Sequence, residues 1–297
     1  MVQIIDLQFK GLPQAIGSFL LESSEGPLLI ESGPHSTYPT LVAKLAIHGY
    51  RPADLKAVLL THIHLDHAGA AWALARAGAP VYVHPAGARH LLQPERLIES
   101  ARRIYLDQMD ALWGEMHPIP EEKLLVVQHG EVLQFGDISI QAWHTPGHAI
   151  HHIAWEWNGF AFTGDVAGVK IGHGLLAPPC PPPDIQVEDW QASIELLRQR
   201  KLTGMYLTHF GLVETVETHL NLLEKNLIEW ADWMRPHYYA QTPYDELVTL
   251  FSGFVHQQLR ACGVDDLGVQ QYEAANPSWM SVTGLLRYWK KKLDHPS

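Results

Sequence analysis

The stretch of sequence that decides the fold is Thr61-His62-Ile63-His64-Leu65-Asp66-His67. It follows the apolar run Leu55–Leu60, which predicts a buried strand, and it precedes an alanine-rich segment with helical spacing. Where the chain is extended, residues two apart point the same way, so His62, His64 and Asp66 can face one pocket. His67 lies where the chain turns into the helix and can join them. Because imidazole and carboxylate groups suit zinc, iron and similar ions, the stretch predicts a metal site at a strand end.

Three later segments each place an imidazole or a carboxylate at the end of a predicted strand. They are His144-Thr145-Pro146-Gly147-His148, Phe162-Thr163-Gly164-Asp165 and Tyr206-Leu207-Thr208-His209. Taken singly, each segment is more typical of a turn or a surface residue. In this order, after the first histidine cluster, they together predict one composite site.

With these four segments the chain resembles the metallo-β-lactamase superfamily. The resemblance covers roughly residues 3–215 and rests on the His-x-His-x-Asp-His signature, the Thr-Pro-Gly-His and Gly-Asp segments and the terminal histidine. It implies an α/β fold, an αββα sandwich of two mixed sheets faced by helices, with a dinuclear metal site at one edge. The intact signature, including His64, looks like that of the hydrolytic members.

The resemblance also implies roles for the cluster residues. His62, His64 and His148 would hold the first metal, Asp66, His67 and His209 would hold the second, and Asp165 would bridge the two. The expected cofactor is a pair of divalent ions, zinc before iron or manganese. Two such ions share a hydroxide that attacks a carbonyl. Asp66 is the candidate catalytic residue, accepting or passing on a proton while it ligates.

Three further side chains are candidates for roles beside the metals. His152 follows His148 closely and is expected to orient a ligand or contact substrate, or else to lie at an exposed turn. His173, between two glycines, either lines the pocket or is exposed. Tyr105 lies in a predicted helical insert, where it either forms an apolar pocket wall or packs the helix onto the core.

The strand pattern stops near residue 215. We therefore predict a core over residues 1–215, with a helical insert at about 94–114, and a helical C-terminal region over 216–297. Within the core, the insert and the proline-rich loop Ala177–Pro183 are expected to flank the pocket.

The segments most resemble the glyoxalase II-like branch, which predicts hydrolysis of a thioester or an ester. That branch usually has Cys-Gly-Lys after its Gly-Asp, whereas this chain offers only Lys170, so glutathione specificity is in doubt. A lactonase with the same site is one alternative. A mononuclear-iron persulfide dioxygenase is another, although that branch usually continues with Gly-Cys where this chain has His151-His152.

Composition narrows the function further. The chain has 297 residues, 46% of them hydrophobic, so it can bury a sizeable core and is not expected to be disordered. The formal net charge is −11, which argues against binding nucleic acid or an anionic membrane. We expect a small-molecule substrate and, since Met1–Lys10 lacks the pattern of a targeting segment, a cytoplasmic location. A homodimer is one expected assembly, beside a monomer.

Overall fold

Apolar strand-length runs in the first half of the chain form one mixed sheet of six strands in sequence order. β1 to β3 pair in antiparallel fashion, whereas β3 to β6 run parallel. The computed structural model describes residues 2–294. The strands are β1 Val2–Asp6, β2 Gly17–Ser23, β3 Gly26–Ile30, β4 Ala57–Leu59, β5 Val81–Val83 and β6 Leu124–Val126.

The second sheet also has six strands, in the order β12-β11-β10-β9-β8-β7. Only β10 and β11 pair in parallel within it. Asn158 and Gly159, both at positive φ, turn β9 into β10, as the Asn-Gly pair predicts for a tight hairpin. The strands are β7 Val132–Phe135, β8 Ile138–His144, β9 Ile153–Trp157, β10 Phe160–Gly164, β11 Gly204–Leu207 and β12 Gly211–Val213.

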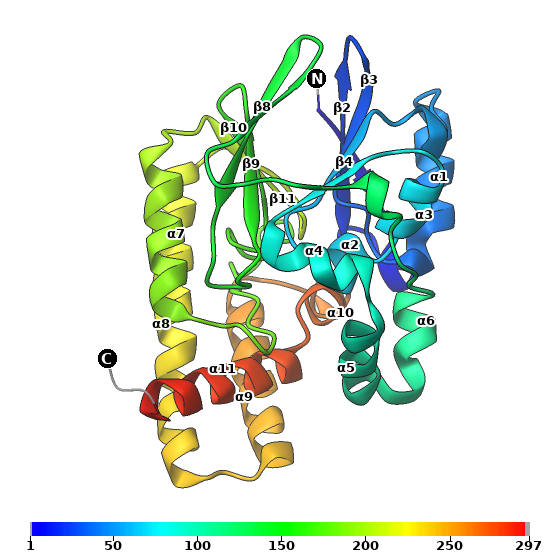
Figure 1. Ribbon diagram of the computed structural model, residues 1–297. Helices are drawn as coiled ribbons and strands as arrows, with labels where there is room; N and C mark the ends of the chain where they lie inside the picture. The colour runs from blue at the N-terminus through cyan, green and yellow to red at the C-terminus, as the bar shows by residue number, and fades with distance from the viewer. Residues whose placement is uncertain (1, 295–297) are drawn as a thin grey trace.

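Helices cover the outer face of each sheet, which makes the αββα sandwich expected from the sequence (Figure 1). Beside the first sheet lie α1 Tyr38–Ile47 and α3 Ala71–Arg76, and beside the second lie α7 Val187–Gln199 and α8 Val216–Ala240. The inner faces of the sheets pack on each other, with the rings of Phe19 and Phe162 5.4 Å apart. This packing brings the ends of β4, β10 and β11 to one edge of the molecule.

The remaining helices lie at that edge and beyond residue 215. α2 Leu65–Ala68 and α4 Pro85–Leu92 follow β4 and β5, and the predicted insert forms α5 Glu95–Tyr105 and α6 Met109–Trp113. The chain ends in α9 Tyr244–Ala261, α10 Asp266–Ala275 and α11 Ser278–Asp294. Among the described residues, no helix combines the length and the apolar character that crossing a membrane requires.

The C-terminal helices share a hydrophobic cluster with α7 and the second sheet. Trp230 of α8 and Leu285 of α11 belong to the same buried cluster as Trp190 of α7 and Met205 of β11. The helices after residue 215 therefore share one continuous core with α7 and that sheet.

The elements differ from the sequence expectations in four places. The alanine-rich segment after the first histidine cluster, expected to be one helix, breaks into α2 and α3, because the Ala70 N–H bonds to the carbonyl of Gly33 at the break. The sequence analysis also missed α4, β12 and α10. The start of α10 had a recognisable signal, since the side chain of Asp265 accepts a hydrogen bond from the N–H of Gly268.

Candidate metal centre

The first sheet supplies four of the cluster residues from one short segment. The chain leaves β4 in extended conformation through His62 and His64, and His64 is the residue that caps the start of α2. Asp66 and His67 then fall in the first turn of that helix. The strand therefore directs two imidazoles toward the edge of the sandwich, and the helix adds a carboxylate and a third imidazole.

The second sheet supplies the other three residues. His148 lies in the loop between β8 and β9, Asp165 directly follows β10, and His209 follows β11. Gly164 sits before Asp165 at φ 48°, and a Cβ there would lie 2.4 Å from Thr61 Oγ1 and 2.8 Å from His152 Nε2. Only glycine fits at this position, because a side chain would collide with groups that support the cluster.

One set of donor atoms gathers around His64. Its Nδ1 lies 3.0 Å from His62 Nε2 and 3.0 Å from His148 Nε2. His148 Nε2 is also 3.3 Å from Asp165 Oδ2. The three imidazoles and this oxygen form a compact group.

A second set gathers around the other oxygen of Asp165. Oδ1 lies 3.2 Å from His67 Nε2 and 3.3 Å from His209 Nε2. Oδ2 of Asp66 lies 3.6 and 3.5 Å from the same two nitrogens. Asp165 therefore turns one oxygen to each donor set, and all seven residues named from the sequence are brought together.

Contacts behind the cluster fix the imidazole orientations. His148 Nδ1 donates to the carbonyl of Pro179 at 2.9 Å and His209 Nδ1 to that of Ala15 at 2.6 Å. His62 Nδ1 lies 2.9 Å from Thr61 Oγ1. In each case Nε2 is left to face the cluster, the arrangement usual for histidines that bind metals.

The donor atoms fit cations. His67 Nε2, Asp165 Oδ1 and His209 Nε2 are buried without a hydrogen-bond partner, which is costly unless an ion satisfies them. Burial lowers the pKa of His209, but Asp165 and Asp66 outweigh it and raise this pKa to about 9. Burial likewise opposes the charged form of His67, yet Asp66 and Asp165 raise its pKa well above the ordinary value. The carboxylates thus favour positive charge here, and these residues include three groups able to hold a metal ion.

Around the first donor set the electrostatics differ. Burial lowers the pKa of His148 to about 4 and that of His62 well below its ordinary value. Both imidazoles are therefore neutral near pH 7, and neutral imidazole is the form that binds a metal.

Asp66 is the more exposed of the two carboxylates in the cluster. Its side chain is 19% exposed, whereas that of Asp165 is 5% exposed. Burial raises the pKa of Asp66, but the adjacent His67 and His209 hold it below its ordinary value.

His152 and His173 have different surroundings. His152 Nε2 accepts a hydrogen bond from the backbone N–H of Asp165 at 3.2 Å, and its Nδ1 lies 2.8 Å from Thr145 Oγ1. This contact orients Asp165 from behind, without access to substrate. His173 is exposed and lies 3.4 Å from the carbonyl of Gly263, so the structure does not bring it to the cluster.

Glu31 is a site residue that the sequence analysis missed. It follows β3, is fully buried, and places Oε1 3.3 Å from Nδ1 of His67. The signal was a carboxyl residue at the end of a predicted buried strand, the same kind of position that singled out Asp165.

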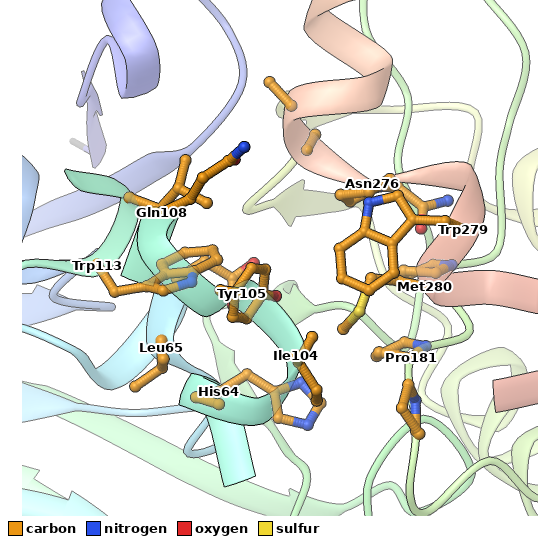
Figure 2. Close-up of a pocket in the computed structure, with 18 of the residues that line it drawn as sticks. His64, Leu65, Ile104, Tyr105, Gln108, Trp113, Pro181, Asn276, Trp279 and Met280 are labelled. Atoms are coloured by element: carbon orange, nitrogen blue, oxygen red, sulfur yellow. The ribbon is translucent and has the colours of Figure 1, made fainter. Parts of the chain in front are cut away.

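A cavity of about 250 Å³ opens above the cluster (Figure 2). His64, Asp66 and Asp165 line it, together with Tyr105 and Trp113 from the predicted insert. Tyr105 is half-buried, with its ring 5.0 Å from that of Trp113. The proline loop contributes a wall, as expected. The turn between α10 and α11 contributes another that the sequence did not indicate.

Similar proteins share the fold. A solved metallo-beta-lactamase family structure, TTHA1429 from Thermus thermophilus, matches 98% of this chain and 93% of its own length, with a TM-score of 0.66 and 20% identity. At that identity the likeness concerns the fold alone, and it includes the C-terminal helices.

Three curated relatives match at the level of sequence. The metallo-beta-lactamase fold-containing protein ST1585 of Sulfurisphaera tokodaii is 30% identical over 58% of this chain and 68% of its own length. An atrochrysone carboxyl ACP thioesterase of Aspergillus fumigatus is 27% identical, over 69% of this chain and 53% of its own length. The hydroxyacylglutathione hydrolase GloC of Haemophilus influenzae is 35% identical over 38% of this chain and 50% of its own length. The chain thus spans about half the length of the latter two.

The family itself is shown by a broader match. The family model described as the metallo-beta-lactamase superfamily matches residues 13–209, a span that contains all seven cluster residues. With that match and the fold around the two donor sets, the chain belongs to the metallo-beta-lactamase superfamily.

Proposed function

We propose that the protein is a metal-dependent hydrolase that binds two divalent ions and cleaves a thioester or an ester. The observation that carries the proposal is Asp165, which turns one oxygen to each of two donor sets. Imidazole and carboxylate donors suit zinc, with iron and manganese as alternatives. One ion would be held by His62, His64 and His148, the other by Asp66, His67 and His209, and both by Asp165.

Different residues of the chain would accept the proton, position the shared carboxylate and exclude water. When bound, two such ions activate a water molecule and polarise the carbonyl oxygen of the substrate. Asp66 turns Oδ2 to His67 and His209, which leaves Oδ1 to accept a proton at the cavity floor. His152 holds the backbone of Asp165 in place, and the apolar cavity walls exclude bulk water from the reacting carbonyl.

The substrate bond is proposed from the relatives and the cavity together. One relative is named as an ACP thioesterase and another as a hydroxyacylglutathione hydrolase, both acting on thioesters by their names. Lys10 is the one lysine or arginine among the described residues that line the cavity, so the cavity offers little to the two carboxylates of glutathione. We therefore favour a thioesterase without glutathione dependence over a strict glyoxalase II.

Metal analysis with a substrate panel tests this function. We expect two ions per chain in natively purified protein, and the highest kcat/KM on thioesters or esters among thioester, ester, lactone and phosphodiester substrates. A preference for lactones would support a lactonase instead. One iron per chain, with oxygen consumed on a persulfide, would replace the hydrolase by a dioxygenase.

An isosteric variant tests the shared carboxylate. Asp165→Asn removes the negative charge common to both donor sets, so metal content should fall to one ion or fewer. kcat/KM should fall more than about 100-fold, beyond the effect usual for residues that only support ligands. Asp189→Asn, the same substitution at an exposed position of α7, is the control and should change neither value. Two retained ions in Asp165→Asn would contradict the shared role.

A further inference from the structure

The cavity above the cluster is assembled from segments that are far apart in sequence. Ile104 and Tyr105 of α5 form one side, and Trp279 and Met280 at the start of α11 form the opposite side. Figure 2 shows these side chains directed toward a common space, with His64 beneath Ile104. Pro181 and its neighbours in the proline-rich loop complete the enclosure.

One carboxyl group in these walls is occupied by the protein itself. The carboxyl group of Glu273 accepts hydrogen bonds from the backbone N–H and the hydroxyl of Ser278, and it lies 3.0 Å from His256 Nε2. It therefore fixes the turn that carries Trp279 and does not serve a ligand. Lys10, Ser100, Gln108 and Asn276 also line the cavity, but most of its lining residues are aromatic, aliphatic or proline, as is typical of sites that bind apolar groups.

The volume of the cavity sets how much of an apolar group its walls can bury. It measures about 250 Å³, below the range of roughly 300–1,000 Å³ usual for pockets that enclose drug-sized ligands. A water molecule or a methylene group occupies on the order of 30 Å³, so this volume corresponds to about eight such groups.

The position of the donor atoms fixes how a substrate would lie. His64, Asp66 and Asp165 line the same cavity as the apolar walls, so an apolar chain in it ends at the cluster. The carbonyl carbon of an acyl group in the cavity would then reach the reacting position beside Asp66.

We propose that this cavity is an acyl-binding pocket that selects thioesters or esters with an apolar acyl group of about six to eight carbons, or an aromatic acyl group of that size. The proposal rests on the proposed hydrolase function. Each buried methylene should raise kcat/KM about fourfold until the cavity is full, and longer chains should bring no further gain.

Two matched substrate series test the direction of binding. The first varies the acyl chain from two to twelve carbons with one constant thiol, and the second varies the alkyl thiol over the same lengths with a constant acetyl group. We expect kcat/KM to rise and level off near eight carbons in the first series and to stay nearly flat in the second. A flat first series would overturn the proposal, as would a dependence confined to the thiol.

Variants at the walls test the pocket itself. Ile104→Trp should fill the cavity and shorten the preferred acyl chain by at least two carbons. Trp279→Ala, which truncates a half-buried side chain on the other side, should lengthen it. Arg103→Trp places the same indole on the exposed face of α5 and should leave the preference unchanged. An unchanged optimum in both wall variants would contradict the assignment.

A binding measurement separates failure of the pocket from failure of the reaction. Octanamide is neutral and is not a thioester, so calorimetry reports its binding whether or not the protein is a hydrolase. It should bind at least tenfold more tightly than butanamide, and Ile104→Trp should abolish the difference. Length-dependent binding without any hydrolysis would refute the proposed reaction alone. Hydrolysis with neither length dependence nor selective binding would refute the acyl pocket alone.

Discussion

Glu31 supports the cluster from a fully buried position behind His67. Its Oε1 lies 3.3 Å from His67 Nδ1, an ion-pair distance. Both carboxyl oxygens are buried, and neither has a hydrogen-bond partner among the described residues. Its backbone has φ 65°, a left-handed conformation that costs a non-glycine residue on the order of 1–3 kcal/mol. The fold maintains that conformation, and the Glu31 N–H bonds to the carbonyl of Leu59 at the end of β4.

Glu31→Gln should weaken the site without abolishing the fold. The amide keeps the shape of the side chain but loses the negative charge that helps raise the pKa of His67 and favours a cation beside it. We expect apparent zinc affinity to fall about 10- to 100-fold, the range usual for residues that support a metal ligand. Competition with a chromophoric chelator measures it, and Glu22→Gln at an exposed position of β2 is the control. Equal affinities in the two variants would rule the role out.

Site residues can be predicted from the sequence where several candidate ligands occur close together. A single residue whose neighbours are distant in the sequence cannot be predicted in this way. His62 and His64 stand two residues apart, and their ring nitrogens lie 3.0 Å from each other, as the extended spacing predicted. Asp66 also joins the cluster, but it does so from the first turn of α2 and not from an extended chain. Glu31 and His173 have no such pattern. Their surroundings depend on contacts with His67 and Gly263, far along the chain, which local spacing does not encode.

At the scale of elements, α8 is tied to the loop that follows Asp165. His219 lies in the first turns of α8, and its Nε2 is 2.7 Å from the carbonyl oxygen of Ala167. Burial lowers the pKa of His219 to about 4, although the carbonyl contact acts in the opposite direction. The histidine is therefore neutral at pH 7 and donates from Nε2, which links the helix to the edge that carries the cluster.

Because the pKa of His219 is lower in the folded chain than in the unfolded chain, the folded protein should lose stability as the pH falls. The unfolded chain binds a proton near pH 6.5 and the folded chain only near pH 4, so stability is full above pH 6.5 and is lost as the pH falls toward 4. Between pH 7.5 and pH 5 the loss should be about 2 kcal/mol. In His219→Gln the amide can still donate but does not titrate, so its urea-unfolding free energy should lose about 2 kcal/mol less over that interval. Parallel pH curves for the two proteins would contradict this assignment.

Element prediction succeeded where local chemistry determines the backbone. The Asn158-Gly159 hairpin requires two left-handed residues. The short strand β5 is two valines around a tyrosine, residue types that favour strands. Element prediction failed where a segment distant in the sequence packs against the chain and changes its backbone. Helical spacing runs through Gly69, yet a Cβ there would lie 3.0 Å from Pro34 Cα, and the helix is interrupted where the β3–α1 connection crosses it.

At the scale of the molecule, the candidate metal centre joins two separately packed halves. His62, His64, Asp66 and His67 come from the segment after β4, whereas His148, Asp165 and His209 come from the second sheet. The cores behind the two sheets are distinct clusters, joined by the layer between the sheets. Two divalent ions would also offset four of the eleven net negative charges of the chain. Bound ions should therefore stabilise the whole fold as well as the site.

Removal of the metals should lower the melting temperature of the protein by about 10 °C. An ion that binds only the folded chain and is present at a thousand times its Kd contributes about 4 kcal/mol, and each kcal/mol moves Tm by about 2–4 °C in a protein approaching this size. Calorimetry with and without EDTA measures the shift. His62→Ala retains the β4 segment but loses a donor, so its Tm should respond to EDTA by less than half as much. If EDTA strips the ions from the wild-type protein and its Tm does not move, the centre does not hold the two sheets together, because ions bound across their shared edge must be lost on unfolding.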